Sequence, residues 1–73
     1  MTITLNGETF DLAAPVTVSQ LLTYLQIDGR RVAVEHNFIV LKRAAYDTTA
    51  LVEGDRVEIV NFVGGGDAPG ALR

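Results

Sequence analysis

Three consecutive glycines, Gly64, Gly65 and Gly66, are the residues of this sequence with the clearest chemical use. They follow directly on the apolar stretch 57–63, close to the end of the 73 residues. Glycine adopts backbone conformations that are closed to other residues, and it adds no side-chain bulk. A glycine run behind a small rigid domain therefore makes a thin arm, which we expect to thread into the active site of another protein. Taken alone, such a run is more typical of a linker.

The other residue types exclude most catalytic chemistry. The sequence has no cysteine, which removes a disulfide framework, a thiolate metal site and a thiol nucleophile. Any sulfur or acyl chemistry must then be carried by the chain's own terminus. The single histidine, His36, has no suitably spaced partner for catalysis or metal binding, so we expect it at the surface. We predict no catalytic residue, no metal site, no bound cofactor and therefore no enzyme.

Length and charge limit the remaining possibilities. With 73 residues, nearly half of them apolar, the chain suffices for one small domain. The formal charge of −3 is spread over interspersed acidic and basic residues, so nucleic acid is not an expected partner. No apolar run approaches the roughly 18–20 residues that span a bilayer, and the N-terminus lacks a secretory signal. We expect a cytoplasmic protein that makes no use of a membrane and is monomeric when free.

The short charged groups are expected at the surface. The basic pairs Arg30-Arg31 and Lys42-Arg43 are typical of solvated side chains. The acidic residues Glu53, Asp55 and Glu58 are interpreted as turn and surface residues that can steer a basic partner.

A hairpin and one helix are predicted in the first half. Apolar and polar side chains alternate before and after Asn6-Gly7, a dipeptide that favours a tight hairpin turn, so residues 1–12 form a hairpin. Thr17 and Gln20 match a capping box. Apolar residues follow at helical spacing, which predicts a helix over about residues 18–26, with Gly29 ending the element.

Returning strands are predicted in the second half. A strand around Val32 and Val34 ends at a turn residue, Asn37, and a short strand is expected over 38–41. An irregular or single-turn connection over 44–49 and a tight turn over 53–55 lead to the last strand, 56–63.

This order of elements is that of an α+β, ubiquitin-like β-grasp: a mixed sheet of four to five strands with one helix on one face. In that fold the last strand lies centrally and parallel to the first. We expect a domain over 1–63 and a flexible glycine-containing tail over 64–73.

The last strand also predicts a partner surface. Val57 and Ile59 alternate toward the core, so Val60 and Phe62 point to the opposite face, which one helix cannot cover. Exposed apolar side chains on an open face usually mark a binding surface. We therefore predict that Val60, Phe62 and Val63 dock a partner. The alternative is a bulge that turns Val60 and Phe62 back into the core.

Four runs in this sequence resemble the sulfur-carrier family of thiamine biosynthesis (ThiS-like). They are Val32–Asn37, Ile39–Arg43, Glu53–Val60 and Phe62–Gly66, and the resemblance covers Thr2–Gly66. The first run together with the Phe-Val-Gly-Gly-Gly ending is specific to the family.

The resemblance implies a mechanism and two partners. In that family an ATP-dependent activating enzyme adenylates the carboxylate of the C-terminal glycine, and sulfur then replaces the adenylate. The resulting thiocarboxylate donates sulfur to thiazole synthase, which builds the thiazole ring of thiamine. Carried over to this chain, Gly66 is the reacting terminus, Gly65 and Gly64 lead to it, and the activating enzyme alone uses ATP.

The chain departs from the family pattern because Asp67–Arg73 follow the glycines. The segment is either removed by a protease, an artefact of cloning or gene assignment, or the mark of an inactive copy. Three other functions remain open: a molybdopterin-synthase type of sulfur carrier, a ubiquitin-like protein modifier, and a plain β-grasp binding module.

Overall fold

The strands and the single α-helix follow the order that the sequence predicts. The computed structural model of the chain describes residues 1–61, so Phe62, Val63, the three glycines and the 67–73 segment lie outside the described residues. The elements are, in order, β1 (Thr2–Leu5), β2 (Glu8–Asp11), α1 (Val18–Tyr24), the 3₁₀ turn η1 (Gly29–Arg31), β3 (Val32–His36), β4 (Ile39–Val40), the 3₁₀ turn η2 (Arg43–Ala45) and β5 (Arg56–Asn61).

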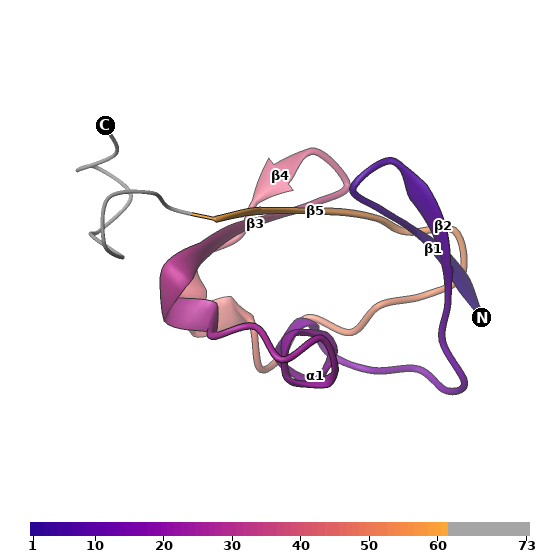
Figure 1. Cartoon of the computed structure of the whole chain (residues 1–73), viewed down its shortest axis with the longest axis horizontal. Helices are drawn as coiled ribbons and strands as arrows, with labels where there is room; N and C mark the ends of the chain where they lie inside the picture. Colours follow the sequence, from indigo (N-terminus) through magenta and orange to yellow (C-terminus); the bar gives the residue numbers. More distant parts are fainter. Residues whose placement is uncertain (62–73) are drawn as a thin grey trace.

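The strands form one mixed sheet in the order β2-β1-β5-β3-β4. Strand β5 lies in the centre, parallel to β1 and antiparallel to β3. Helix α1 packs on one face of the sheet, and Figure 1 shows the other face without a covering helix. This is the β-grasp predicted from the sequence. No helix within residues 1–61 is long and apolar enough to cross a membrane.

The core lies between α1 and the covered face of the sheet. Its fully buried side chains are aliphatic and come from β1, α1, β3, the loop before β5 and β5 itself, so the helix and the sheet stabilise each other. They are Ile3, Val18, Leu21, Val32, Val34, Leu51 and Val57.

Local turn chemistry fixes the first half of the fold. Asn6 and Gly7 both have positive φ, 49° and 82°, so the predicted hairpin turn is confirmed. The capping box is confirmed as well. The backbone N–H of Gln20 donates to the Thr17 hydroxyl at 3.1 Å, and the backbone N–H of Thr17 donates to the Gln20 side-chain oxygen at 2.8 Å. These bonds satisfy donors that a helix start otherwise leaves without partners.

The predicted end of the helix is wrong. Helix α1 ends at Tyr24, and Gln26 rather than Gly29 takes the left-handed conformation, with φ of 61°. Gly29 instead begins η1, where a residue without a side chain is needed because neighbouring side chains lie close by. A Cβ there would lie 3.3 Å from Cδ1 of Leu22, close to the ring of Tyr46. The glycine therefore allows the chain to pass close to the core, and a short stretch after the helix can reach β3.

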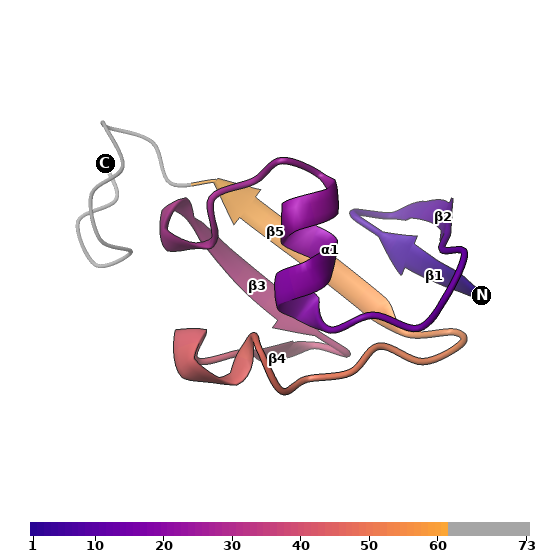
Figure 2. The same cartoon turned by 90° about the horizontal axis from the view of Figure 1, so that it is seen from below.

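The second half follows the prediction with one shorter strand. Asn37 has φ of 51°, and the 44–49 connection contains η2 and a turn, as expected. Strand β4 covers only Ile39–Val40 instead of 38–41, because Phe38 also adopts a left-handed backbone, with φ of 71°, and belongs to the turn. Figure 2 shows β4 as a short strand at the sheet edge, followed by the coil of η2.

The capping box gives the first testable prediction. Replacing Thr17 by Ala removes the oxygen that accepts from Gln20 N–H, and we expect the free energy of unfolding to fall by about 1 kcal/mol. Urea unfolding followed by circular dichroism measures this. Thr23→Ala is the matched control, because Thr23 is exposed inside the same helix. It should leave stability unchanged or raise it by a few tenths of a kcal/mol, since alanine favours helix interiors. Equal losses in both variants would contradict the capping role.

Candidate functional site

The uncovered face of the sheet presents exposed apolar side chains beside the strand that leads to the glycines. Val57 is fully buried, whereas Val60 lies on the opposite face and is 53% exposed, as the alternation predicted. The bulge alternative, which would bury Val60, is therefore wrong for this residue. Phe38 and Val40 are also exposed. We call Phe38, Val40 and Val60 the open-face cluster.

The ring of Phe38 is covered on one side by the guanidinium of Arg56. The guanidinium carbon of Arg56 lies 4.9 Å from the centre of the Phe38 ring, a cation–π geometry, and Phe38 is 75% exposed. A left-handed backbone costs a non-glycine residue roughly 1–2 kcal/mol. A strained aromatic side chain that gains little burial suggests a role outside the core. Arg56 also pairs with Glu58, so the charges on this face are partly compensated.

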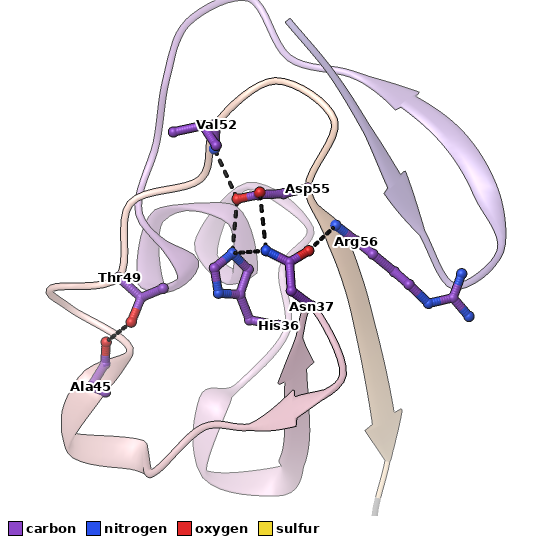
Figure 3. A network of polar contacts seen from close by, with 7 residues as sticks. All are labelled: His36, Asn37, Ala45, Thr49, Val52, Asp55 and Arg56. Atoms are coloured by element: carbon purple, nitrogen blue, oxygen red, sulfur yellow. Dashed lines mark hydrogen bonds and ion pairs between the residues drawn. The ribbon is translucent and has the colours of Figure 1, made fainter.

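A second group of polar residues surrounds the start of β5, and Figure 3 shows it from close by. The carboxylate of Asp55 is 2.8 Å from Nε2 of His36 and accepts from Nδ2 of Asn37 at 3.2 Å and from the backbone N–H of Val52 at 2.9 Å. The side-chain oxygen of Asn37 in turn accepts from the backbone N–H of Arg56 at 2.9 Å. One carboxylate thus joins the β3–β4 turn, the preceding loop and the central strand.

This network corrects two predictions. Asp55 was expected at the surface but is only 7% exposed, and the His36 side chain, also expected there, is 20% exposed. Asp55 is buried and His36 is half-buried, because the two polar groups bond to each other. The two residues are 19 positions apart, so their spacing in the sequence does not reveal this contact. Burial alone would raise the pKa of Asp55. The hydrogen bonds from His36, Val52 and Asn37 outweigh it, and the pKa is lowered.

The network joins three segments of the fold through one carboxylate. Within residues 1–61, no group of three or more His, Asp or Glu side chains lies close enough to hold a metal ion. Within residues 1–61, the carboxylate of Asp55 and the His36 ring bond to each other, to Asn37 and to the backbone N–H of Val52, and none of these partners is a hydroxyl. The described part of the chain therefore combines an exposed apolar face with a polar network that joins loops to the central strand.

The predicted terminus follows the described residues in the sequence. Gly64, Gly65 and Gly66, with Phe62 and Val63, lie outside the described residues, so their roles stay predictions. Of the predicted docking residues, the structure describes Val60 alone. Sequence reasoning missed Phe38 and Val40 because an apolar run is typical of a buried strand. The preceding turn residue, Asn37, could have indicated that Phe38 belongs to a turn.

A β-grasp domain whose central strand runs toward a glycine-rich end defines the class of ubiquitin-like carrier proteins. The sequence model of the ThiS family matches residues 3–66. The crystal structure of a thiamine biosynthesis protein (ThiS) from Geobacter metallireducens superimposes with a TM-score of 0.80 at 38% identity, covering 90% of this chain and all of that one. The chain belongs to the ThiS family.

Curated relatives extend this finding. The sulfur carrier protein ThiS of Bacillus subtilis is 38% identical over 50 residues, which cover 68% of this chain and 76% of that protein. Thiazole synthases of Paramagnetospirillum magneticum and Magnetococcus marinus are each 42% identical, over 66 and 71 residues. These two matches cover 90% and 97% of this chain. They cover only 20% and 22% of the length of the two thiazole synthases. The family predicted from the sequence is confirmed.

The Asp55 network predicts acid-sensitive stability. The pKa of Asp55 is lower in the folded chain, so the unfolded chain takes up this proton first as pH falls. The carboxylate therefore stabilises the fold above its unfolded-state pKa, and this contribution is lost as pH falls through the folded-state value. We expect Asp55→Asn to lower the free energy of unfolding by about 1–3 kcal/mol near neutral pH and by less in acid.

Urea unfolding at neutral pH and at about pH 3 tests this. Glu8→Gln is the control, because Glu8 is an exposed carboxylate on the edge strand β2. It should leave the neutral-pH stability unchanged. A loss for Asp55→Asn that is the same at both pH values would show that the carboxylate charge contributes nothing.

Proposed function

We propose that this ThiS-family chain carries sulfur for thiazole formation as a thiocarboxylate on Gly66. Its family membership and its likeness to a sulfur carrier and to thiazole synthases support the proposal. The observation that carries it is the position of the glycines. They begin three residues after Asn61, where the described part of the central strand ends.

The proposed chemistry explains the residue types. A carboxylate is a poor electrophile, so an activating enzyme first joins it to AMP from ATP with release of pyrophosphate. Sulfur then displaces AMP at the glycine carbonyl carbon. Glycines suit a segment that must reach a nucleotide site through a narrow opening, since no side chain obstructs it.

In this proposal the chain is a cosubstrate and not an enzyme. Adenylation and ring formation belong to the activating enzyme and to thiazole synthase. The carrier's part is to present the reacting end and a surface that both enzymes can bind. The well-packed body with hydrogen-bonded loops fits that part, because a rigid carrier delivers its end with little loss of conformational freedom.

The residues after Gly66 require a cleavage step in this proposal, because a peptide carbonyl offers no carboxylate to adenylate. One comparison supports a natural origin of this segment over an artefact of cloning. The match to the Magnetococcus thiazole synthase covers 71 of the 73 residues, so it must include at least Asp67–Ala71. We propose that hydrolysis of the Gly66–Asp67 bond creates the reacting carboxylate.

The terminus is tested by mass spectrometry. The 73-residue chain and a chain ending at Gly66 are each incubated with ATP, the activating enzyme and a sulfur source. We expect only the shorter chain to gain the mass difference between one sulfur and one oxygen atom. A chain ending at Gly66 with Gly65 and Gly66 replaced by Ala is the control for the glycines, and it should gain little or no sulfur.

Two results would contradict the proposal. Thiocarboxylate at Arg73 of the full chain would show that the glycines need not be terminal. A chain ending at Gly66 that accepts no sulfur would favour a plain binding module.

We further propose that the activating enzyme docks on the open-face cluster together with Phe62 and Val63. Val60 supports this, because it is exposed and lies just before the glycine segment. Apolar side chains at the centre of an interface often contribute more than about 1 kcal/mol each to binding.

Val60→Ala tests this docking. We expect the dissociation constant for the activating enzyme to rise by about fivefold or more, while the free energy of unfolding falls by less than about 1 kcal/mol. Calorimetry and urea unfolding measure the two quantities. Val52→Ala is the matched control, because Val52 is similarly exposed in the loop before β5. Equal effects of the two substitutions on binding would remove Val60 from the interface.

A further inference from the structure

Two glutamates lie directly opposite each other on the uncovered face of the sheet. Glu35 of β3 and Glu58 of the central strand β5 are register partners in an antiparallel pair. Val34 and Val57, next to them in the sequence, are fully buried, so both carboxylates point away from the core. Opposite side chains on one face have Cβ atoms about 4.5–5.5 Å apart, and like charges at that position destabilise a sheet. The fold therefore contains an unfavourable charge pair beside its centre.

One carboxylate of this pair is compensated within the described chain and the other is not. The guanidinium of Arg56 forms an ion pair with Glu58, and the same group lies over the ring of Phe38. Within residues 1–61, Glu35 takes part in no ion pair. Arg56 thus shows how this face accommodates a guanidinium, against an aromatic ring and a carboxylate, while one negative charge is left over.

The glutamate pair lies within the open-face cluster. Val40 is the register partner of Glu35 on the side of β4. Val60 follows Glu58 by two residues, on the same face, and is opposite Ala33. Both valines are exposed, and both glutamates are half-buried. A protein that covers the two valines therefore also removes water from the two carboxylates.

We infer that the protein that docks on the open-face cluster inserts a basic side chain between Glu35 and Glu58. The inference rests on the proposed function. A carboxylate that loses water at an interface without gaining a partner weakens binding, and a second carboxylate opposite it adds repulsion. A cation from the docking protein removes both costs. Arginine fits best, because its planar guanidinium can donate to two carboxylates at once.

This arrangement predicts opposite effects on stability and on binding. Glu35→Gln keeps the size of the side chain but removes the repulsion from Glu58, so the urea midpoint of unfolding should stay the same or rise. The same substitution removes a partner of the incoming cation, so binding should weaken. Glu35→Lys should increase both effects, because it places a cation opposite Glu58 at the position that the basic side chain of the docking protein would occupy.

The experiment measures calorimetric binding of the full 73-residue chain to the activating enzyme of the same organism, together with urea unfolding. Glu8→Gln and Glu8→Lys are the matched controls, because they change the net charge by the same amounts. Glu8 is exposed on β2, which β1 and β5 separate from β3 in the sheet. We expect Glu35→Gln to raise the dissociation constant about three- to tenfold, and Glu35→Lys by more than about tenfold. Each control should change it less than about twofold.

Three results would overturn the inference. The first is a dissociation constant that Glu35→Gln leaves unchanged or lowers, or that Glu8→Gln raises as much. The second is a lower urea midpoint for Glu35→Gln, which would show that Glu35 stabilises the fold. The third is a full chain that does not bind the enzyme. The mass-spectrometric test on the chain ending at Gly66 decides the proposed function separately, because sulfur can be accepted without this contact.

Discussion

The register of the central strand is the constraint on which the rest of this structure depends. Asp55, immediately before β5, accepts from Asn37 and Val52 with its carboxylate and from the backbone N–H of Thr4 with its carbonyl oxygen at 2.9 Å. Asn6 accepts from the N–H of Ile59 at 2.7 Å further along the strand. Because side chains alternate along a strand, a slip of one residue would exchange its two faces. These bonds therefore keep Val57 in the core and Val60 on the open face.

A buried carboxylate is a costly way to fix a register unless all its hydrogen bonds are made. Asp55 meets this condition, and within residues 1–61 no buried side-chain polar atom lacks a hydrogen-bond partner. The cost of an unsatisfied donor or acceptor then acts against alternative registers, because each would leave a buried polar group without its partner. Hydrophobic burial holds β5 in the sheet, and the polar network selects one position for it.

The predictions that succeeded rest on local chemistry or on the order of elements. The Asn6-Gly7 turn and the Thr17–Gln20 capping box involve residues at most three apart, whose geometry is nearly fixed by residue type. The central place of β5 follows from the β-grasp order. What failed depends on contacts across the fold. Asp55 and His36 are 19 residues apart, so their pairing could not be read from spacing. The Glu-Gly-Asp turn suggested a solvated residue instead. Gly29 was similarly misread, because its neighbours Leu22 and Tyr46 come from different elements.

The position of Val60 in the candidate site was predictable, because side chains alternate along a strand. The position of Phe38 was not predictable, because it depends on the conformation of a turn. Val60 was placed correctly by counting along β5. Phe38 was assigned to a strand, because the four consecutive apolar residues 38–41 fit burial better than exposure. Its exposure comes from two successive left-handed residues, Asn37 and Phe38, a conformation that sequence composition does not favour for an aromatic residue.

A carrier that visits two enzymes must leave the first before it serves the second. A large, dry interface would give long residence times, whereas transient encounters use smaller ones. The open-face cluster contains only Phe38, Val40 and Val60, and the charges of Arg56 and Glu58 on the same face partly compensate each other. In the proposed function, a docking face with so small an apolar area keeps dissociation fast. Such a face is suited to transfer, for which turnover matters more than affinity.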